Sequence, residues 1–240
     1  MADIIDLFRA CSESNITTFQ KLGDNLLFLK NAKNLVFGES KSGKTYTVIK
    51  SLVDSGFKDN VIHLDFDRNA DERLQNLGVE SYHIKDVSLL FNILLQAMTA
   101  KDFDISNSLK DKIFIIDSLQ DLSPQDGIDS NSGALSAMYK VDLLMFTGAT
   151  IIIIHHATLD MYGKAKVKGN SAVITSKCDT TILFQKINNN RRTMTVLNTR
   201  AEDKIPSGTM IPYTSDDQTQ DQQITSKPRQ NDRVPPYGQK

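Results

Sequence analysis

The sequence predicts an α/β protein: a mainly parallel, twisted sheet flanked by helices, with an antiparallel hairpin near the C-terminus. Two observations predict this fold class. Four short, nearly continuous apolar runs alternate with segments of helical periodicity, a pattern typical of parallel strands that are buried on both faces. From Thr180 onward, strand-like runs follow one another with only short connections, which favours antiparallel pairing.

The four apolar runs are the expected parallel strands of this sheet. They are Asn34–Phe37, Val61–Leu64, Ile113–Ile116 and Thr150–Ile154. The segments between them carry apolar residues at spacings of three and four, so one face of each can pack on the sheet. We expect helices over Thr45–Ser55, Val87–Ala100 and Gly133–Phe146.

The antiparallel part follows these elements. Its strand-like runs are Thr180–Ile187, Thr193–Thr199 and Thr209–Tyr213. Only five residues, 188–192, join the first two runs, and so short a connection predicts a hairpin.

We divide the chain into three parts. Residues 1–30 are predicted to form a mostly helical N-terminal segment, with helix over Ile4–Cys11 and Phe19–Leu29. Residues 31–213 contain the sheet and form one domain. Residues 214–240 are rich in Gln, Asp and Pro and contain no Leu or Phe to bury, which predicts a disordered polar tail.

Composition excludes several classes of protein. The 240 residues are 40% hydrophobic and 24% charged, as in ordinary globular proteins. Cys11 and Cys178 belong to no C-x-x-C pair, which argues against a disulfide framework and a cysteine zinc site. Residues Met1–Asp6 lack the basic segment of a signal peptide, and no stretch has about 18 consecutive apolar residues. We therefore expect a cytoplasmic protein that does not span a membrane.

The balance of charge bears on nucleic acid. The formal net charge is -1, so the protein has no general excess of positive charge to attract phosphates. Any binding of nucleic acid must therefore depend on a local basic surface.

A phosphate-binding loop is the strongest functional motif. Residues 38–45 match G-x-x-x-x-G-K-[ST] and lie between an expected strand and an expected helix, as the mechanism of such a loop requires. They are Gly38, Glu39, Ser40, Lys41, Ser42, Gly43, Lys44 and Thr45. Backbone N–H groups and Lys44 would bind the phosphates of ATP, and the Thr45 hydroxyl would bind Mg²⁺. The alternative is a glycine-rich turn that matches by chance.

A carboxylate for the same magnesium ion is expected at the end of another strand. Ile113–Ile116 is followed by Asp117, the usual arrangement of the acidic residue that supports Mg²⁺ in such proteins. The alternative is that Asp117 only stabilises the following turn, together with Ser118 and Asp121.

Hydrolysis also needs a group that orients or deprotonates water. Val61–Leu64 leads directly to Asp65 and Asp67, whose side chains point to the same side if the strand geometry continues. We predict that Asp67, nearer the open end, is the catalytic carboxylate, with Glu72 as a longer alternative. A solvated acidic loop without a catalytic role is the other interpretation.

Two histidines follow the fourth apolar run. Adjacent residues on a strand point to opposite faces, so His155 and His156 do not form a metal-binding pair. We predict that His155 is a structural, hydrogen-bonded residue. His156 is then predicted to contact the γ-phosphate of ATP.

A basic segment comes next. Lys164, Lys166 and Lys168 alternate with apolar residues between Gly163 and Gly169, which predicts a flexible basic loop. Such a loop could bind the backbone of single-stranded DNA, with Tyr162 as the one aromatic side chain available for stacking. An exposed loop without a ligand is an equally acceptable interpretation.

The order of these motifs resembles the RecA-like branch of the P-loop ATPases over roughly residues 30–213. Within that branch, the segment from Ile151 to Lys186 is similar to the double-histidine segment of hexameric replicative helicases of the RepA type, found on plasmids, and of their phage and mobile-element relatives. The matching features are His155 and His156, the basic segment, Gly169–Ala172 and Asp179 before a hairpin. The resemblance implies a RecA-like ATPase domain over residues 31–213.

In this family, ATP is usually bound between neighbouring subunits of a ring. The resemblance therefore implies a homo-oligomer, expected to be a hexamer, and makes Arg200 the residue that reaches the neighbouring subunit's γ-phosphate. Two positions depart from the family pattern: Asp67 stands where a Glu is usual, and Asn198 stands where ring helicases often have Lys. Both departures are compatible with slow hydrolysis.

Two functions remain open from the sequence. The first is an ATP-hydrolysing helicase, translocase or recombinase that acts on single-stranded DNA in replication or recombination. The second is a regulatory or assembly ATPase that oligomerises on nucleotide and does not translocate on DNA. The double-histidine segment favours the first, whereas the near-neutral charge and the scarcity of aromatic residues in the basic segment favour the second.

Overall fold

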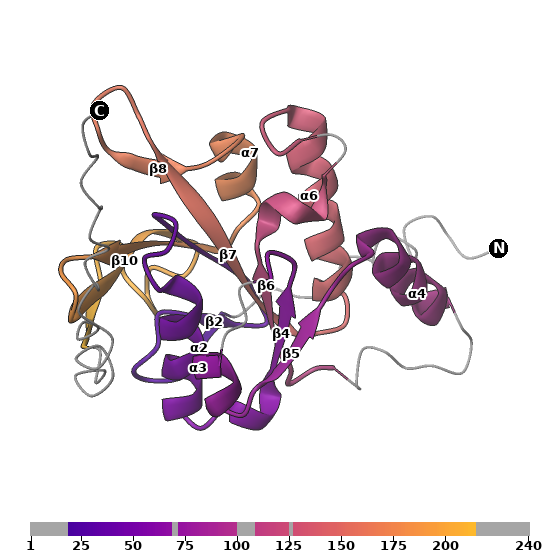
Figure 1. The fold of residues 1–240 in the computed structure, drawn as a ribbon, viewed down its shortest axis with the longest axis horizontal. Coiled ribbons are helices and arrows are strands. Elements are labelled where there is room, and N and C mark those ends of the chain that lie inside the picture. The colour runs from indigo at the N-terminus through magenta and orange to yellow at the C-terminus, as the bar shows by residue number, and fades with distance from the viewer. Residues whose placement is uncertain (1–18, 69–71, 100–108, 125–126, 215–240) are drawn as a thin grey trace, which may run out of the picture.

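A nine-stranded sheet runs through the computed structural model, which describes residues 19–68, 72–99, 109–124 and 127–214 (Figure 1). The strand order is β11-β10-β9-β3-β7-β6-β4-β5, and β8 pairs with β7 beside this path. Strands β9, β3, β7, β6, β4 and β5 are parallel to one another, whereas β10 is antiparallel to both of its neighbours. The predicted tail beyond Thr214 and the predicted helix Ile4–Cys11 lie outside the described residues.

The predicted strands and helices are all present in the sheet region, with ends shifted by a few residues. The strands are β3 (Lys33–Gly38), β4 (Val61–Asp65), β5 (Glu80–His83), β6 (Ile113–Asp117), β7 (Thr150–Leu159), β8 (Ala165–Val167), β9 (Thr180–Lys186), β10 (Arg191–Thr199) and β11 (Met210–Thr214). The helices are α2 (Lys44–Asp54), α3 (Glu72–Asn76), α4 (Val87–Thr99), α6 (Asn131–Met145) and α7 (Ser171–Ser176), with 3-10 turns η1 (Lys58–Asn60) and η2 (Leu119–Leu122).

Helices cover both faces of the sheet and create two cores (Figure 1). On one face, α2 buries the apolar residues that predicted it, Val48, Ile49 and Leu52. On the other face, α6 buries Ala137 and Met138, and α4 and α7 pack beside it. The central strands contribute alternate side chains to both cores, which explains their continuous apolar sequence.

The helical prediction for Phe19–Leu29 is wrong. This segment forms a two-stranded antiparallel ribbon of β1 (Gln20–Lys21) and β2 (Leu29–Lys30). A turn at Gly23 and Asp24 reverses the chain, and the following residues Leu26–Leu29 are almost completely buried in the core beneath α2. Burial in the main core overrides the weak helical periodicity, so the sheet domain includes residues 19–30.

The flexible-loop prediction for the basic segment is also wrong. Strand β7 continues past His155 and His156 to Leu159, and Ala165–Val167 returns as β8, paired with residues 157–159. The two strands form a hairpin that projects from the body of the molecule (Figure 1). The backbone of Lys166 therefore pairs with β7, and Lys164 and Lys168 lie on either side of β8.

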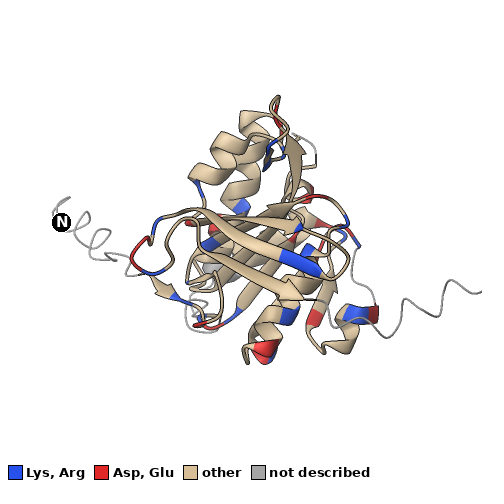
Figure 2. Ribbon diagram, turned by 90° about the vertical axis from the view of Figure 1, so that its left-hand side faces the viewer, with Lys and Arg blue, Asp and Glu red and all other residues tan. Residues whose placement is uncertain are grey.

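Acidic and basic residues are interspersed over the ribbon seen in Figure 2, and the net charge is -1. Among the helices that the structure describes, none has both the length and the apolar character needed to cross a bilayer.

Candidate functional site

The parallel register brings the predicted site residues to one edge of the sheet. Gly38 at the end of β3 is in register with His156 on β7, and Asp117 at the end of β6 is in register with Asp65 on β4. Ligands of open parallel sheets bind outside the carboxyl ends of the strands, which is this edge.

A cavity of about 390 Å³ opens at this edge. Lys44, Thr45, Asp67, Asp117 and His156 all line it. The other lining residues are Ser40, Lys41, Gly43, Tyr46, Arg73, Leu74 and Ile154. The structure thus brings together four of the five predicted catalytic residues and five of the eight residues of the predicted phosphate-binding loop.

Two glycines of the loop are required by geometry. A Cβ atom at Gly38 would lie 2.3 Å from the carbonyl oxygen of Phe184 on β9, so no larger residue fits where these strands meet. Gly43 has φ of 89°, in the left-handed region that favours glycine, and α2 begins at the next residue. The loop therefore turns sharply into the N-terminus of α2, whose free N–H groups attract anions.

Lys44 is held within the loop. Its Nζ donates hydrogen bonds to the carbonyl oxygens of Gly38, at 3.0 Å, and Glu39, at 2.6 Å. Burial lowers the pKa of Lys44 to about 8, although the nearby carboxylates Asp117 and Asp67 favour the charged form. The ammonium group is thus already desolvated and placed beside the loop that would hold phosphates.

Thr45 and Asp117, which the sequence predicts as ligands of Mg²⁺, are in direct contact. The Thr45 hydroxyl donates a hydrogen bond to Oδ2 of Asp117 at 2.6 Å, and Asp117 is buried at the end of β6. A hydroxyl and a carboxylate are oxygen ligands of the kind that Mg²⁺ prefers, and water and phosphate oxygens usually complete its coordination. These residues therefore fit a magnesium ion bound together with a nucleotide.

A buried histidine lies behind Asp117. Nε2 of His63 is 3.8 Å from Oδ2 of Asp117, and its Nδ1 forms a hydrogen bond of 2.6 Å with the Ser81 hydroxyl on β5. The side chain of His63 is completely buried. His63 thus lies between Ser81 on the outer strand of the sheet and the Asp117 carboxylate.

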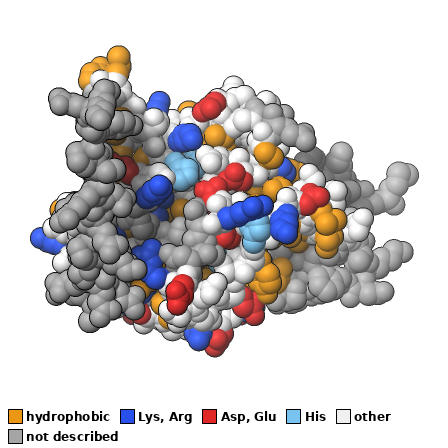
Figure 3. All heavy atoms as spheres, in the orientation of Figure 1, with side chains coloured by type: hydrophobic (Ala, Val, Ile, Leu, Met, Phe, Trp, Pro, Cys, Tyr) orange, Lys and Arg blue, Asp and Glu red, His pale blue; other side chains and the backbone are white. Residues whose placement is uncertain are grey.

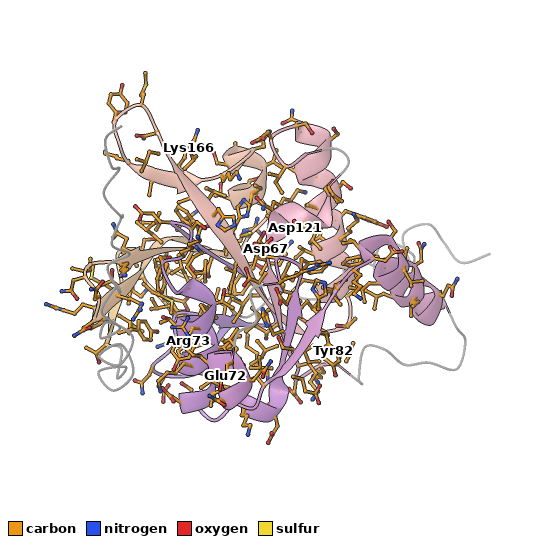
Figure 4. All side chains as sticks on the ribbon, viewed as in Figure 1. Asp67, Glu72, Arg73, Tyr82, Asp121 and Lys166 are labelled. Carbon is orange, nitrogen blue, oxygen red and sulfur yellow. The ribbon has the colours of Figure 1, made fainter. Side chains whose placement is uncertain are left out.

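Asp67 faces His156 across the cavity. Oδ2 of Asp67 is 3.5 Å from Nε2 of His156, and hydrogen bonding to this histidine is the main reason that the pKa of Asp67 falls to about 2. Asp121 lies beside Asp67 (Figure 4) and accepts a hydrogen bond of 2.8 Å from Ser118. Burial and the hydrogen bond with Asp67 raise the pKa of Asp121 to about 6.

The two histidines have the different environments that the strand geometry predicted. His156 lines the cavity. His155 is buried, and its Nε2 lies 3.0 Å from the carbonyl oxygen of Lys168. Burial lowers the pKa of His155 to about 4, so the ring is neutral at pH 7 and Nε2 carries the hydrogen that the carbonyl accepts.

The alternative acid, Glu72, points away from this edge. It is exposed on the first turn of α3, and Figure 4 shows it at a distance from Asp67 and Asp121. Asp65 is buried at the end of β4 and is not among the residues that line the cavity. Of the three carboxylates Asp65, Asp67 and Glu72, Asp67 is the one that lines the cavity.

Sequence reasoning missed two lining residues that suit a base. The guanidinium carbon of Arg73 lies 5.6 Å from the centre of the Tyr46 ring, and both residues line the cavity. Aromatic rings and guanidinium planes both stack on planar, electron-rich groups. Their positions in the sequence could have identified them. Tyr46 comes directly after the phosphate-binding loop, and Arg73 lies on the first turn of α3, a few residues after Asp67.

Arg192 was also missed. It lies near the start of β10, and its Nε donates a hydrogen bond of 3.3 Å to the carbonyl oxygen of Ser42. Its guanidinium group packs so closely on Gly43 that a Cβ there would be 3.1 Å from Nε. The C-terminal hairpin thus supports the phosphate-binding loop from outside, a contact between residues 150 positions apart.

Arg200 lies at the opposite edge of the sheet. It follows Thr199, which pairs with Thr180 near the beginning of β3 rather than at its phosphate-binding end. Its guanidinium group binds the Asp179 carboxylate at 3.2 Å and the Ser176 carbonyl oxygen at 2.8 Å, and its side chain is 56% exposed. Arg200 therefore cannot serve the nucleotide cavity of its own subunit.

The three predicted DNA-binding lysines occupy different places. Lys164 and Lys166 lie on the projecting hairpin, and Figure 4 shows Lys166 well away from Asp67. Lys168 lies at the base of the hairpin, where its Nζ donates a hydrogen bond of 3.3 Å to Oε1 of Gln120. The apolar residues Leu159, Met161 and Tyr162 are strongly exposed at the hairpin end.

A scan against protein-family models and a search of curated protein sequences find no match. Among solved structures, the crystal structure of the RadB recombinase is similar to this chain, with a TM-score of 0.53. The match has 14% sequence identity and covers 78% of this chain and 88% of that chain. At this identity the likeness concerns the fold alone. The mainly parallel sheet with antiparallel C-terminal strands is accordingly a RecA-like fold, as the sequence predicted.

Proposed function

We propose that this chain is an ATPase that binds ATP with Mg²⁺ in the cavity at the carboxyl edge of its sheet. The observation that carries this proposal is the hydrogen bond of 2.6 Å between Thr45 and Asp117, formed directly beside the buried ammonium group of Lys44. A chance glycine-rich turn would have no reason to face a carboxylate at the end of a separate strand. The RecA-like fold supports the same conclusion.

Each residue then has a chemical task. Lys44 and the N-terminus of α2 bind the β- and γ-phosphates, and His156 contacts the γ-phosphate from β7. A bound magnesium ion would offset the negative charge of the phosphates. Asp67 accepts a hydrogen bond from the attacking water and orients it; because its pKa is about 2, it is a weak proton acceptor at pH 7.

Tyr46 and Arg73 supply the place for the adenine. They line the same cavity as Lys44 and Thr45, and their side chains already face each other. A purine stacked against this pair would have an apolar face removed from water. The cavity therefore offers separate surfaces to the base and to the phosphates.

We further propose that the enzyme acts on single-stranded DNA as a helicase, translocase or recombinase in a homo-oligomer. The support is the projecting hairpin, which carries Lys164, Lys166 and the exposed ring of Tyr162. The first strand of this hairpin is β7, which also carries His156. DNA and the γ-phosphate would therefore contact the same strand. The double-histidine segment resembles RepA-type helicases of plasmids and phages, in which such an arrangement belongs to a hexameric ring.

The second candidate is a nucleotide-gated assembly or regulatory ATPase. The observation in its favour is the modest charge of the hairpin, which offers two lysines and one exposed tyrosine for DNA. The two candidates differ in one measurable property, because only a DNA motor should hydrolyse ATP faster when single-stranded DNA is present.

The test measures ATP turnover with and without a single-stranded oligonucleotide while light scattering records the mass in solution. We expect Mg²⁺-dependent hydrolysis that increases severalfold with DNA and an assembly larger than a monomer. A Lys44→Ala variant is the control: it should fold normally and lose tight ATP binding, because the side chain serves the ligand. Unchanged nucleotide affinity in a folded Lys44→Ala variant would contradict the ATPase proposal. An ATPase rate that is the same with and without single-stranded DNA would favour the regulatory function.

A further inference from the structure

A second cavity, of about 340 Å³, lies next to the nucleotide cavity. Ser40 of the phosphate-binding loop and His156 of β7 line both cavities. The remaining lining residues of the second cavity are Gln120, Ala157, Thr158 and Lys168. The shared residues place the second cavity at the end of the nucleotide cavity where His156 would contact the γ-phosphate.

Lys168 is fixed at this second cavity by three hydrogen bonds. Its backbone N–H donates to the carbonyl oxygen of His156 at 3.0 Å, and its own carbonyl oxygen accepts from Nε2 of His155 at 3.0 Å. Its Nζ donates to Oε1 of Gln120 at 3.3 Å. An ammonium group has three hydrogens, so Nζ can still donate to a further acceptor in the cavity.

The two cavities differ in the charge of their walls. The nucleotide cavity is lined by two carboxylates, Asp67 and Asp117, and by three cations, Lys41, Lys44 and Arg73. The described residues that line the second cavity include one lysine and no carboxylate, and the hydroxyls of Ser40 and Thr158 and the amide of Gln120 add hydrogen-bond donors. The second cavity therefore offers a free, doubly charged anion a cation and no carboxylate that would repel it. On the face that Figure 3 shows, histidine surface lies beside basic side chains.

We propose that the second cavity receives inorganic phosphate after ATP hydrolysis, with Lys168 as its cation. This inference rests on the proposed ATPase function. In the reaction, the water oxygen bonds to the γ-phosphorus while the bond from phosphorus to the β–γ bridging oxygen breaks. ADP keeps the bridging oxygen, and HPO₄²⁻ and a proton are released to solvent. Repulsion from Asp67 and attraction by Lys168 direct the phosphate past His156 into the second cavity.

Binding of inorganic phosphate to the protein saturated with Mg²⁺ and ADP tests the site directly, by isothermal titration calorimetry. We expect Lys168→Ala to weaken phosphate binding at least tenfold and Lys168→Arg to restore most of it. Lys177→Ala removes the same charge from an exposed position outside both cavities and should leave phosphate binding unchanged. Equal phosphate affinity in wild type and Lys168→Ala, or equal losses in Lys168→Ala and Lys177→Ala, would overturn the proposal.

Release kinetics provide a second readout. In a single turnover, acid quenching measures cleavage of ATP, and a fluorescent phosphate-binding protein measures phosphate in solution. We expect Lys168→Ala to shorten the delay between cleavage of ATP and the appearance of phosphate in solution, because the weakened site no longer retains the product. If cleavage slows and the delay before release is unchanged, Lys168 acts on the chemical step, and the second cavity is not a phosphate site.

A DNA phosphate is the other possible source of an anion at Lys168. Anisotropy of a labelled single-stranded oligonucleotide separates the two sources. We expect Lys166→Ala to lose more DNA affinity than Lys168→Ala, and only Lys168→Ala to lose phosphate affinity. The opposite pattern would assign Lys168 to DNA and overturn the proposal. Absence of ADP binding and ATP cleavage in the wild type would instead refute the ATPase function itself.

Discussion

Asp67 and Asp121 lie together at the carboxyl edge of the sheet but hold protons with very different affinity. The pKa of Asp67 is about 2, because His156 hydrogen-bonds its ionised form, whereas that of Asp121 is about 6. Asp67 is thus charged throughout the physiological range, and the pair becomes doubly charged only when pH rises past about 6. As pH falls through about 6, Asp121 takes up a proton while Asp67 keeps its charge.

Replacement of Asp67 tests its catalytic role. Asp67→Asn keeps the size of the side chain and removes the charge that orients water, so ATP binding should persist while turnover falls about 10²-fold or more. Nucleotide titration and steady-state hydrolysis measure the two effects separately. Glu72→Gln is the matched control and should turn over normally. A normal rate in Asp67→Asn together with a slow Glu72→Gln variant would mean that Asp67 is the wrong acid.

Lys44 makes nucleotide affinity depend on pH. Its pKa in the free protein is about 8, below the ordinary value of a lysine, and phosphates bind its charged form. Since the charged form is lost as pH rises through this value, ATP affinity should be constant near pH 7 and fall about tenfold per pH unit well above 8. Equilibrium titrations from about pH 7 to 9.5 measure this slope. A Lys44→Arg variant, which stays charged, should bind ATP with a flatter profile over this range.

Among the secondary-structure elements, the β7–β8 hairpin connects the two proposed activities. Its base holds His155 and His156, and its end exposes apolar and basic side chains. Because β8 is paired along its length with β7, a movement of the histidines would move the hairpin as a unit. This continuity gives a physical route by which ATP hydrolysis could shift bound DNA.

Alanines at Lys164 and Lys166 should weaken DNA binding without changing ATP hydrolysis in the absence of DNA. Each DNA phosphate that a lysine no longer neutralises removes about 0.7 from the salt dependence of single-strand binding, so the slope should fall by up to about 1.4. Anisotropy titrations at several salt concentrations measure it. Identical affinity and slope in wild type and the double variant would favour the regulatory ATPase.

The β1–β2 ribbon is predicted to stabilise the whole domain. Phe28 is completely buried beneath α2, so Phe28→Ala should lower the free energy of unfolding by about 3–5 kcal/mol. Phe146, at the end of α6, is 67% exposed, and its replacement by alanine should have little effect. Chemical denaturation of both variants measures the difference. Equal unfolding midpoints would mean that the ribbon does not belong to the core.

Sequence patterns predicted the strands that are covered on both faces of the sheet. The strands ending at Gly38, Asp65 and Asp117 are visible as apolar runs, because both of their faces are covered. Strand β5 was missed: all four of its residues are exposed, and only backbone pairing with β4 defines it. Strand β8 was missed because a run of alternating lysines between two glycines is more typical of a loop.

The site was predictable where a motif fixes local geometry and unpredictable where the fold brings distant residues together. Residues 38–45 and Asp117 follow from their positions at strand ends. By contrast, the contact of Arg192 with Ser42 and the neighbouring positions of Tyr46 and Arg73 depend on how β10 and α3 pack. No periodicity or spacing in the sequence encodes these contacts.

For the whole molecule, the distance of Arg200 from its own nucleotide cavity has a consequence for assembly. If Arg200 reaches the γ-phosphate of a neighbouring subunit, Arg200→Ala should lower hydrolysis on the order of 10³-fold, since its guanidinium group would stabilise the charge that develops there. Asp117→Ala should also be inactive, because it lacks the magnesium carboxylate.

Mixing these two inactive proteins provides the test. Some interfaces would then combine an intact Asp117 on one side with an intact Arg200 on the other, and part of the ATPase activity should return. Subunit exchange must be shown independently, for example by energy transfer between labelled subunits. If ATPase activity does not return although subunits exchange, Arg200 does not act on a neighbouring subunit. It then only forms a surface ion pair with Asp179, which contributes little to stability.

Strand β3 ends in the phosphate-binding loop and lies between β7 and β9, while Arg192 of β10 supports that loop from outside. A ribosome makes the loop early, but both neighbours of its strand and its supporting arginine appear more than 100 residues later. Until these later residues are made, the nascent chain therefore carries an exposed apolar strand without partners, and its loop cannot hold a nucleotide. Folding of this domain should be a late event governed by long-range pairing, with a corresponding need for protection of that strand in the cell.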